Sequence, residues 1–454
     1  MIEKSFKAGA AQVKITPPLG TRINGDFVAH YATHIHDDLY SKALVLQRSW
    51  ETIVIIVVDI CSMSCEFIES VKKEITTKTN IPDKNIMISS THTHASGSIE
   101  DVHMGGPDLA FRRTLPEKIV LSVEQAIDKL QPAKITNGKV SVPDHVLCRR
   151  YQMKPEYRPI NPVNGLIDSI KTNPIGLEKY IDHPISNPDP EVSFIGVKST
   201  DEEWISVLGN YSLHYVGDWP NGTISSDYFG VFARNIKSLL KANSDFVGIM
   251  TNGTSGDINI WDFQQPERYP TEYFAKSELI GKDIADTVFR SFSGSRWNEF
   301  PEISARIKPL PIHTRKPGID EIKRASEIIM ASDYDSYEYN DDNLRKIYAR
   351  EQILLNEFPN SREAKIQAFK IGDLTLGTLP GEFFAETGLK LKNEIGDHYF
   401  TIGLANGNIG YVPPAEEMKK GGYETWRCRY SCISSEAEYL FRKELIDLVK
   451  GFDI

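Results

Sequence analysis

The sequence has no long hydrophobic run and no excess of positive charge. Its longest apolar run, Ile53 to Val58, ends at Asp59 and is far shorter than the roughly 18 residues needed to span a bilayer. The 454 residues carry a formal net charge of −10, and Lys and Arg are scattered along the chain. Because phosphate backbones are bound by clustered basic side chains, we expect neither a membrane span nor a nucleic-acid partner.

Cysteine is also scarce. The chain has five, an odd number, so at least one is free or forms an intermolecular bond. Cys61 and Cys65, like Cys428 and Cys432, stand four apart, a spacing that can place two thiols on one helical face for zinc. Without a closer Cys-x-x-Cys pair, small buried hydrophobic residues are the better interpretation.

The first six residues lack the charged-then-apolar pattern of a secretory signal. We therefore expect a cytoplasmic protein as the chain stands, or an exported one if a signal has been removed.

Length and composition are those of an ordinary globular protein, with 40% hydrophobic and 25% charged residues. A chain of this length buries a core that is stable without disulfides or a structural metal. Any metal site therefore indicates chemistry. No internal repeat or low-complexity linker divides the chain, which predicts one domain over residues 1–454.

Strand-like and helix-like segments alternate along the chain, which predicts an α/β fold. The region 144–190 is rich in Pro, Asn and aromatic residues without clean periodicity, and we expect it to form a long surface excursion that shapes a cleft. Strands are expected at Ala8–Ile15, Ala43–Arg48, Thr52–Asp59, Asn85–Ser90, Val192–Lys198, Trp204–Tyr211, Phe246–Thr251 and Ala364–Leu379. Helices are expected at Cys65–Lys78, Glu117–Leu130, Tyr228–Leu240, Ser277–Arg290, Gly318–Leu355 (interrupted by an acidic loop) and Ser435–Val449.

The strongest chemical signal is His92-Thr93-His94, directly after the expected strand that ends at Ser90. In an extended segment, residues two apart point to the same face, so both imidazoles can converge on one centre. Strand ends are also where α/β proteins build their sites. The alternative, two polar histidines making ordinary hydrogen bonds at a turn, has equal weight on this motif alone.

Other candidate residues are ambiguous one by one. His214, which follows an expected strand, is more often a structural histidine, and Glu382 can simply begin a helix. The small-residue loop 251–259 suits an anion or a tight turn equally well. Tyr411 and Tyr423 stand near Gly/Pro turns, and buried tyrosines usually just satisfy a hydroxyl.

Taken in order along the chain, these segments resemble the N-terminal catalytic domain of the neutral/alkaline non-lysosomal ceramidases. The resemblance implies an α/β domain with mixed β-sheets flanked by helices. The Thr-His-Thr-His and Leu-Pro-Gly-Glu-Phe strings are fairly specific, and the remaining strings are supportive. The segments that carry the resemblance are Gly9–Pro17, His36–Ala43, Ser90–His94, Leu379–Phe383, Gly410–Tyr411 and Tyr423–Glu424.

The resemblance implies a zinc ion, with ligands His92, His214, Glu382 and Tyr411. Two imidazoles, one carboxylate and one phenol oxygen suit Zn²⁺. Its other implications concern catalysis: His94 would handle a proton beside the metal, and Tyr423 would stabilise charge on the attacked carbonyl. Arg149 or Arg150 would lie near the substrate.

The sequence departs from the family at a serine that has been assigned a catalytic part. Asn259 stands where that serine would be, in Gly256-Asp257-Ile258-Asn259, and Ser255 lies at a different offset. The family's C-terminal β-sandwich also has no counterpart in these 454 residues. Both departures put ceramide in doubt as the substrate, while the zinc ligands are retained.

We therefore expect a zinc-dependent hydrolase that cleaves an amide or ester bond of a small molecule through a metal-activated water. Asp257 and Asn259 are expected to line the pocket or orient that water. Two alternatives stay open. One is an enzyme acting on a sugar-linked amide, acetyl ester or lactone, and the other is a zinc-containing binding protein without turnover.

Overall fold

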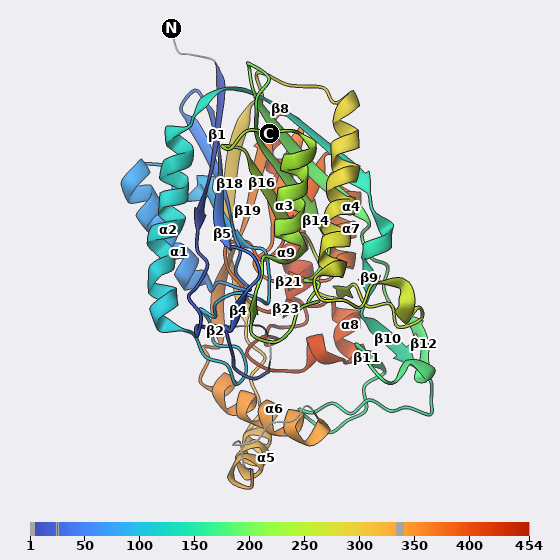
Figure 1. Cartoon of the computed structure of the whole chain (residues 1–454). Coiled ribbons are helices and arrows are strands. Elements are labelled where there is room, and N and C mark those ends of the chain that lie inside the picture. The colour runs from blue at the N-terminus through green and yellow to red at the C-terminus, as the bar shows by residue number, and fades with distance from the viewer. Residues whose placement is uncertain (1–4, 24, 26, 333–339, 454) are drawn as a thin grey trace.

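The computed structural model describes residues 5–23, 25, 27–332 and 340–453 (Figure 1). Residues 1–4, and residues 333–339 of the acidic loop expected over 333–342, lie outside this set.

An eight-stranded sheet forms the centre of the fold, in the order β16-β14-β13-β8-β1-β5-β6-β7. The pairs β6/β7 and β14/β16 are parallel and the other neighbours are antiparallel. Only two residue pairs join β1 to β8, so the sheet consists of two halves, each with one parallel pair. The strands are β1 (Phe6–Lys14), β5 (Tyr40–Arg48), β6 (Glu51–Val58), β7 (Ile86–Ser90), β8 (Gln131–Ser141), β13 (Glu191–Ser199), β14 (Trp204–Tyr211) and β16 (Val247–Asn252).

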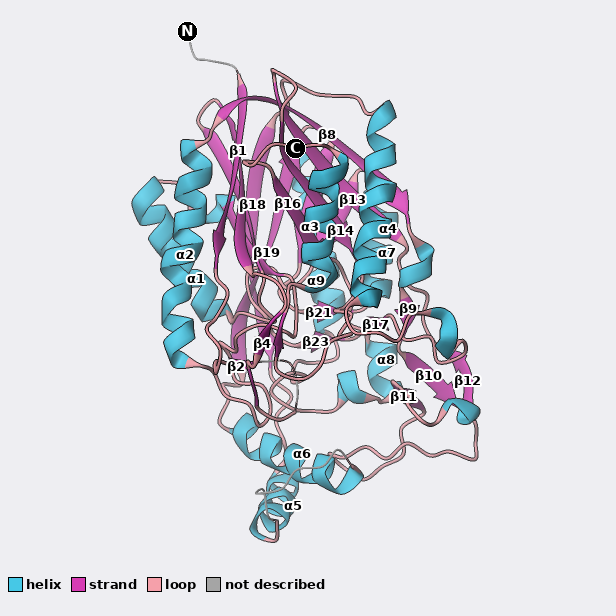
Figure 2. Cartoon of the chain, in the orientation of Figure 1, coloured by secondary structure: helices cyan, strands magenta, loops and turns pink. Residues whose placement is uncertain are grey.

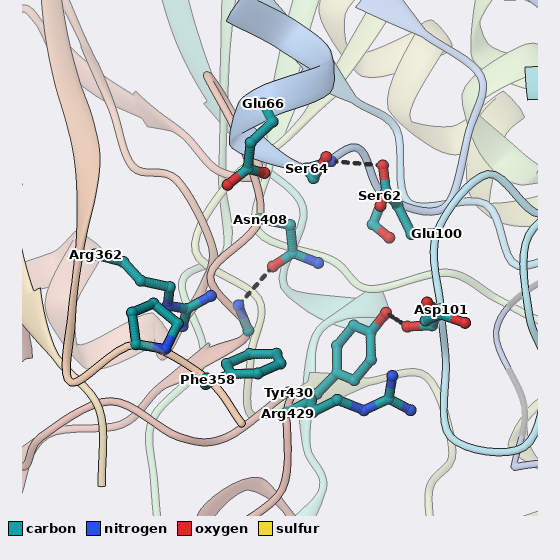
Figure 3. Close-up of a pocket in the computed structure, with 12 residues that line it drawn as sticks. Ser62, Ser64, Glu66, Glu100, Asp101, Phe358, Arg362, Asn408, Arg429 and Tyr430 are labelled. Carbon is teal, nitrogen blue, oxygen red and sulfur yellow. Dashed lines mark hydrogen bonds between the residues drawn. The ribbon is translucent and has the colours of Figure 1, made fainter. Parts of the chain in front are cut away.

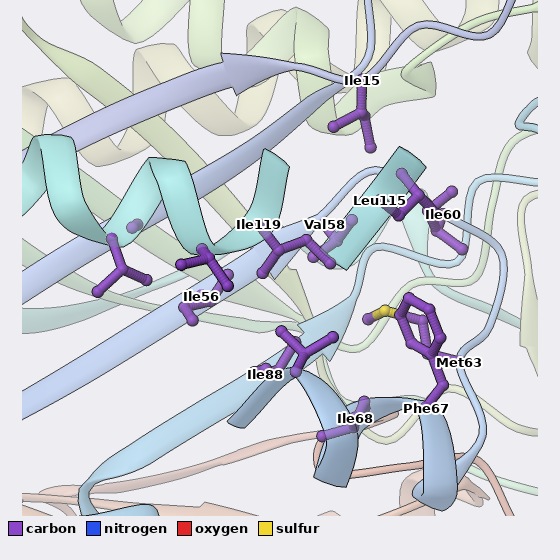
Figure 4. Close-up of a cluster of buried hydrophobic side chains, with 14 of the residues drawn as sticks. Ile15, Ile56, Val58, Ile60, Met63, Phe67, Ile68, Ile88, Leu115 and Ile119 are labelled. Atoms are coloured by element: carbon purple, nitrogen blue, oxygen red, sulfur yellow. The ribbon is translucent and has the colours of Figure 1, made fainter. Parts of the chain in front are cut away.

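Four helices cover the outer face of this sheet. Helices α1 (Cys65–Thr79) and α2 (Leu109–Asp128) pack on the half that contains β1, β5, β6 and β7, and α3 (Asp227–Leu239) and α4 (Ala275–Ser291) pack on the other half. Figure 4 shows the first contact, where strand residues such as Ile56 and Ile88 meet Ile68 of α1 and Ile119 of α2.

A second sheet packs on the inner face of the first, in the order β18-β19-β20-β22. Alternate residues of one strand serve the two layers: Ile55 and Val57 face the second sheet, whereas Ile56 and Val58 face the helices. Helices α7 and α9 cover the far side, giving the layer order helix, sheet, sheet, helix (Figure 2). These elements are β18 (Ile303–His313), β19 (Ser361–Ile371), β20 (Leu374–Thr378), β22 (Tyr399–Ile402), α7 (Ala385–Ile395) and α9 (Ala437–Lys450).

Short elements gather at the end of the layers where β6, β7, β14, β16 and β20 terminate (Figures 1 and 2). The region 144–190, expected to be irregular, contributes four short strands there. Helices α5 and α6 project from the same end (Figure 1). The short elements are β2 (Arg22–Ile23), β3 (His30–Tyr31), β4 (His34–Ile35), β9 (Leu147–Cys148), β10 (Arg150–Met153), β11 (Ile170–Thr172), β12 (Ile181–Pro184), β15 (Thr223–Ile224), β17 (Ile258–Asn259), β21 (Glu382–Phe383), β23 (Tyr411–Val412), α5 (Ile319–Met330), α6 (Asp341–Asn356) and α8 (Ala415–Lys420).

The prediction of an α/β fold with mixed sheets flanked by helices is confirmed, and two element boundaries are wrong. Helix α2 begins at Leu109, eight residues before the expected start, because Asp108 caps it and Pro116 is accommodated inside it. The strand expected over 364–379 is a hairpin, because Gly372 takes a positive φ of 63° and turns the chain between β19 and β20.

Strands β8 and β18 were not expected from the sequence.

Across the described ranges, no helix combines the length and the apolar character that crossing a membrane requires.

Candidate metal centre

Three side chains of the expected ligand set come from segments that follow strand ends. His92 lies two residues after β7, His214 three residues after β14, and Glu382 begins β21 four residues after β20. The parallel pairs of the two sheet halves end at the same place, so segments far apart in sequence meet there. The sequence-based prediction of a site at strand ends therefore describes the position of these three residues.

The three side chains converge on one point inside the protein. The Nε2 atoms of His92 and His214 lie 3.5 and 3.8 Å from Oε2 of Glu382. All three residues are buried. Among the residues that the structure describes, Oε2 of Glu382 has no hydrogen-bond partner. The geometry is that of a group able to hold a metal ion.

Backbone carbonyls orient both imidazoles. Nδ1 of His92 donates to the carbonyl oxygen of Cys61 at 2.7 Å, and Nδ1 of His214 donates to that of Ser255 at 3.2 Å. Because a carbonyl only accepts, each ring carries a proton on Nδ1 and turns its Nε2 toward Glu382. This arrangement is typical of metal-binding histidines.

The backbone at His92 is strained. Its φ of 72° lies in the left-handed region, which non-glycine residues seldom adopt. The conformation is held by the segment that follows β6, since the amide of His92 donates to the carbonyl of Ile60. Strain of this kind is concentrated at functional sites.

His94 stands beside the three converging residues. Its Nε2 lies 3.2 Å from Nε2 of His92, and its ring stacks on Tyr215 with centroids 3.7 Å apart. Gly25 also lies against the ring, since a Cβ added to it would come within 2.4 Å of His94. Burial and the neighbouring His92 lower the pKa of His94 well below its usual range. His94 is thus a fixed, neutral imidazole next to the centre.

Tyr411 reaches the centre through strand pairing. Strands β21 and β23 are parallel, and their register places Tyr411 opposite Glu382. The guanidinium of Arg149 lies over the Tyr411 ring, 5.4 Å from its centroid. Tyr423 meets the Tyr411 ring edge-on at 5.6 Å. Burial above all raises the pKa of both phenols, so both hydroxyls keep their protons.

The two arginines differ in position. Nε of Arg149 donates to Oε1 of Glu424 at 2.7 Å, and its Nη2 donates to the carbonyl of Gly256. Arg150 contacts the other Glu424 oxygen at 2.6 Å and also pairs with Glu417, away from Tyr411. Of the two, Arg149 is the one that touches the expected ligand set.

Asp257 and Asn259, which were expected to line the pocket or orient the water, have other partners, and so does the nearby Ser255. The carboxylate of Asp257 accepts from Ser186 Oγ at 2.7 Å and from the amide of Ala385, at the first turn of α7. Asn259 bonds to Asn173 and to the amide of Trp261. Ser255 contributes its carbonyl to His214. The structure therefore brings together His92, His94, His214, Glu382, Tyr411, Tyr423 and Arg149, and it engages Asp257 and Asn259 elsewhere.

Sequence reasoning missed Gly25 and Tyr215, and it considered Cys61 only as a thiol paired with Cys65, not as the carbonyl that orients His92. Cys61 follows β6 as His92 follows its parallel neighbour β7, so the strand-end argument could have included it. Tyr215 adjoins His214 in sequence. No local pattern marks Gly25, because its role depends on contact with a residue almost 70 positions away.

The fold and the site together define the class of protein: a mixed α/β protein with two packed sheets, in which the buried side chains of His92, His214 and Glu382 meet at strand ends. Residues 6–157 match the family described as neutral/alkaline non-lysosomal ceramidase, N-terminal, which confirms the resemblance drawn from the motifs. That region contains His92, His94 and Arg149. No curated protein matches the chain by sequence.

Solved structures extend the likeness to nearly the whole chain. Neutral ceramidase from Pseudomonas aeruginosa is 17% identical, with a TM-score of 0.75 over 99% of this chain and 75% of that one. A second structure, described as ceramidase complexed with C2, is 16% identical, with a TM-score of 0.73 over 99% and 76% of the two chains. The chain therefore has the fold of neutral ceramidase.

Proposed function

We propose that this chain is a zinc-dependent hydrolase of an amide or ester bond. The observation that carries the proposal is the buried Oε2 of Glu382, which faces two imidazole nitrogens and has no hydrogen-bond partner within the described ranges. A buried carboxylate without a partner is costly, and a cation offsets that cost. Burial lowers and Glu382 raises the pKa of His92, with the net shift strongly upward, so the centre attracts positive charge.

The donor set fits zinc. His92, His214 and Glu382 would hold the ion, with the phenol oxygen of Tyr411 as the fourth ligand. Nitrogen and oxygen donors in this ratio suit Zn²⁺, and carbonyl-anchored imidazoles support it. When bound, zinc supplies a water whose pKa is lowered to about 7 and a positive charge for the substrate's carbonyl oxygen.

The chain's own residues supply the remaining chemistry. The Tyr423 hydroxyl, kept protonated by burial, would donate to the oxygen on which negative charge develops. Neutral His94 would accept a proton and pass it to the leaving amine or alkoxide. Arg149 holds Tyr411 in position.

The likeness to neutral ceramidases suggests which type of bond the chain cleaves, but not the whole substrate. Neutral ceramidases suggest an N-acyl lipid, and we infer that the chain acts on a small-molecule acyl amide or ester. A sugar-linked substrate is the alternative within the same chemistry.

The zinc assignment is tested by metal analysis of purified variants. His92→Ala and Glu382→Ala should each lose bound zinc and hydrolysis, whereas His94→Ala should lose hydrolysis and retain most zinc. His398→Ala, at an exposed position, is the matched control. Full zinc content in the His92 variant would refute the ligand assignment.

Turnover is tested separately with acyl-amide and acyl-ester libraries. Hydrolysis of lipid or of sugar-linked members identifies the substrate class. Zinc-loaded protein that is inert across both libraries would instead be a binding protein.

A further inference from the structure

The segment 421–430, which carries Tyr423, borders open space at both ends. At its last residue lies a polar cavity of about 390 Å³, where the Tyr430 hydroxyl donates to the carbonyl of Asp101 (Figure 3). A second polar cavity of about 300 Å³ is lined by Gly421 and Thr425. Because cavities adjoin the segment in place of tightly packed side chains, its position depends strongly on hydrogen bonds to the rest of the protein.

The carboxylate of Asp168 holds this segment on both sides of Tyr423. Its Oδ2 accepts from the amide of Gly422 at 2.9 Å and from the indole Nε1 of Trp426 at 2.7 Å. Its Oδ1 accepts from Nδ2 of Asn161 at 3.2 Å. A single oxygen therefore ties the residue before Tyr423 to the side chain three residues after it.

These bonds lie inside the protein. Asp168 is 8% exposed and Trp426 is 5% exposed. Gly421 passes directly against the carboxylate, since a Cβ added to it would lie 2.2 Å from Cγ of Asp168. Without the carboxylate, the amide of Gly422 and the indole nitrogen would each lose a buried acceptor, which is costly.

Trp426 connects Asp168 to the candidate metal centre. The indole meets the Tyr423 ring edge-on, with centroids 6.1 Å apart, and the Tyr423 ring meets that of Tyr411 edge-on at 5.6 Å. Tyr423 thus packs between an indole that Asp168 holds and an expected zinc ligand. A tilt of the indole would move the Tyr423 ring relative to Tyr411.

Two arginines hold the same segment by its carbonyl groups. Nη2 of Arg150 donates to the carbonyl of Gly421 at 3.0 Å, and Nη2 of Arg315 donates to that of Thr425 at 3.2 Å. These bonds keep the segment attached to the protein when Asp168 is replaced. They do not bind the indole proton, for which Asp168 is the acceptor.

We infer that Asp168 is a positioning residue for the Tyr423 hydroxyl. The inference rests on the proposed function, in which that hydroxyl donates to the oxygen that becomes negative. Such a donor stabilises the transition state only at hydrogen-bond distance from the developing charge, and a displacement of about 1 Å can cost roughly 100-fold in rate. Asp168 acts through the amide of Gly422 and the indole of Trp426.

The kinetic test uses zinc-loaded protein and an acyl substrate found with the libraries. Asp168→Ala should lower kcat at least about tenfold, change KM less than about threefold and retain its zinc. Asp182→Ala, an exposed aspartate of β12, should behave as the wild type does. In a Tyr423→Phe background, Asp168→Ala should have little further effect, because the hydroxyl that it positions is already missing. An equal loss of kcat in both backgrounds would overturn the inference.

A second variant separates the lost acceptor from a general loss of packing. Asp168→Asn/Asn161→Asp reverses the hydrogen bond between the two side chains and keeps a carbonyl oxygen at position 168 for Gly422 and Trp426. It should recover at least about half of wild-type kcat. A double variant no more active than Asp168→Ala would exclude the acceptor as the cause.

Fluorine NMR of protein labelled with 3-fluorotyrosine distinguishes this inference from the hydrolase proposal. The Tyr423 resonance is assigned by its absence in Tyr423→Phe. It should shift or broaden in Asp168→Ala and stay unchanged in Asp182→Ala, whether or not a substrate is found. An unchanged resonance in Asp168→Ala would refute the inference even in an active hydrolase. Inert libraries together with a shifted resonance would refute the hydrolase and support Asp168 as the residue that positions Tyr423.

Discussion

Two buried glutamates close to the same site differ in how they are satisfied. Both oxygens of Glu424 are bonded: Oε1 accepts from Arg149 at 2.7 Å, and Oε2 accepts from Arg150 at 2.6 Å and from Thr172 at 2.8 Å. Oε2 of Glu382 has no such donor in the described part of the chain and faces two imidazole nitrogens.

The difference separates a structural charge from a functional one. Although burial raises the pKa of Glu424, the two guanidiniums lower it further, so this carboxylate stays ionised and holds Arg149 and Arg150 in place. Glu382 lies in β21, where it pairs with Tyr411 of β23, and one of its oxygens is left for a ligand. Buried charge alone does not mark a metal ligand, but at Glu382 the oxygen without a donor also faces two imidazole nitrogens.

Substitution of Glu424, the glutamate with both oxygens bonded, should have the largest effect on stability. Glu424→Gln leaves Arg149 and Arg150 buried with a neutral partner, and we expect it to lower the free energy of unfolding by about 4 kcal/mol. Denaturant unfolding measures the loss. Glu416→Gln, an exposed position on α8, should change stability little, and an equal loss in both variants would contradict the comparison.

Adding zinc should satisfy the other glutamate. Zinc at 100 times its dissociation constant should stabilise metal-free wild-type protein by about 3 kcal/mol, because only the folded state assembles the ligands. Thermal unfolding at matched protein concentrations measures the shift. Glu382→Gln should show little of it, and a full shift in that variant would place the ion elsewhere.

The sequence predicted the layered α/β class and the strand-end position of the site because both depend on local periodicity and on motifs such as Thr-His-Thr-His. It did not predict how Asp257 is used, since its partners Ser186 and Ala385 are distant in the chain. The hairpin at Gly372 was missed because similar alternating apolar residues stand on both sides of the Gly372-Asp373 turn, and this two-residue turn signal was not used. Long-range hydrogen-bond partners, which distinguish Glu424 from Glu382, have no local signal.

Lys72 extends the comparison from buried carboxylates to a buried cation that lies outside the candidate metal centre. Lys72 is a residue of α1. Its amino group lies 3.7 Å from a carboxylate oxygen of Asp83 and makes no hydrogen bond to any described residue. Burial lowers the pKa of Lys72 to about 8. Lys72→Met should therefore stabilise the protein by about 2 kcal/mol at pH 7, since a charged amine no longer has to be buried.

The sign of the pH dependence follows from the same shift. The unfolded chain holds the Lys72 proton up to about pH 10.5 and the folded chain up to about pH 8. The cost of burying the ammonium is thus fully present below pH 8 and disappears as the pH rises to 10.5. The advantage of Lys72→Met should decline over that interval in denaturant unfolding curves. A constant difference, or an equal gain from Lys73→Met on the exposed face, would exclude a desolvated amine.

The smallest effect is expected where the comparison began. Glu382→Gln in metal-free protein should change the free energy of unfolding by less than about 1 kcal/mol, because Oε2 makes no hydrogen bond to lose. In the absence of metal, the raised pKa of His92 keeps a proton on that ring, and this positive charge offsets part of the charge of the Glu382 carboxylate. Glu382→Gln removes both charges, so the two electrostatic changes nearly cancel. Glutamate-to-glutamine substitution would then lower the free energy of unfolding by several kcal/mol at Glu424 and by almost nothing at Glu382. At Glu382 it would abolish zinc binding. A loss at Glu382 in chelator-treated protein as large as that at Glu424 would mean that Glu382 is a structural carboxylate.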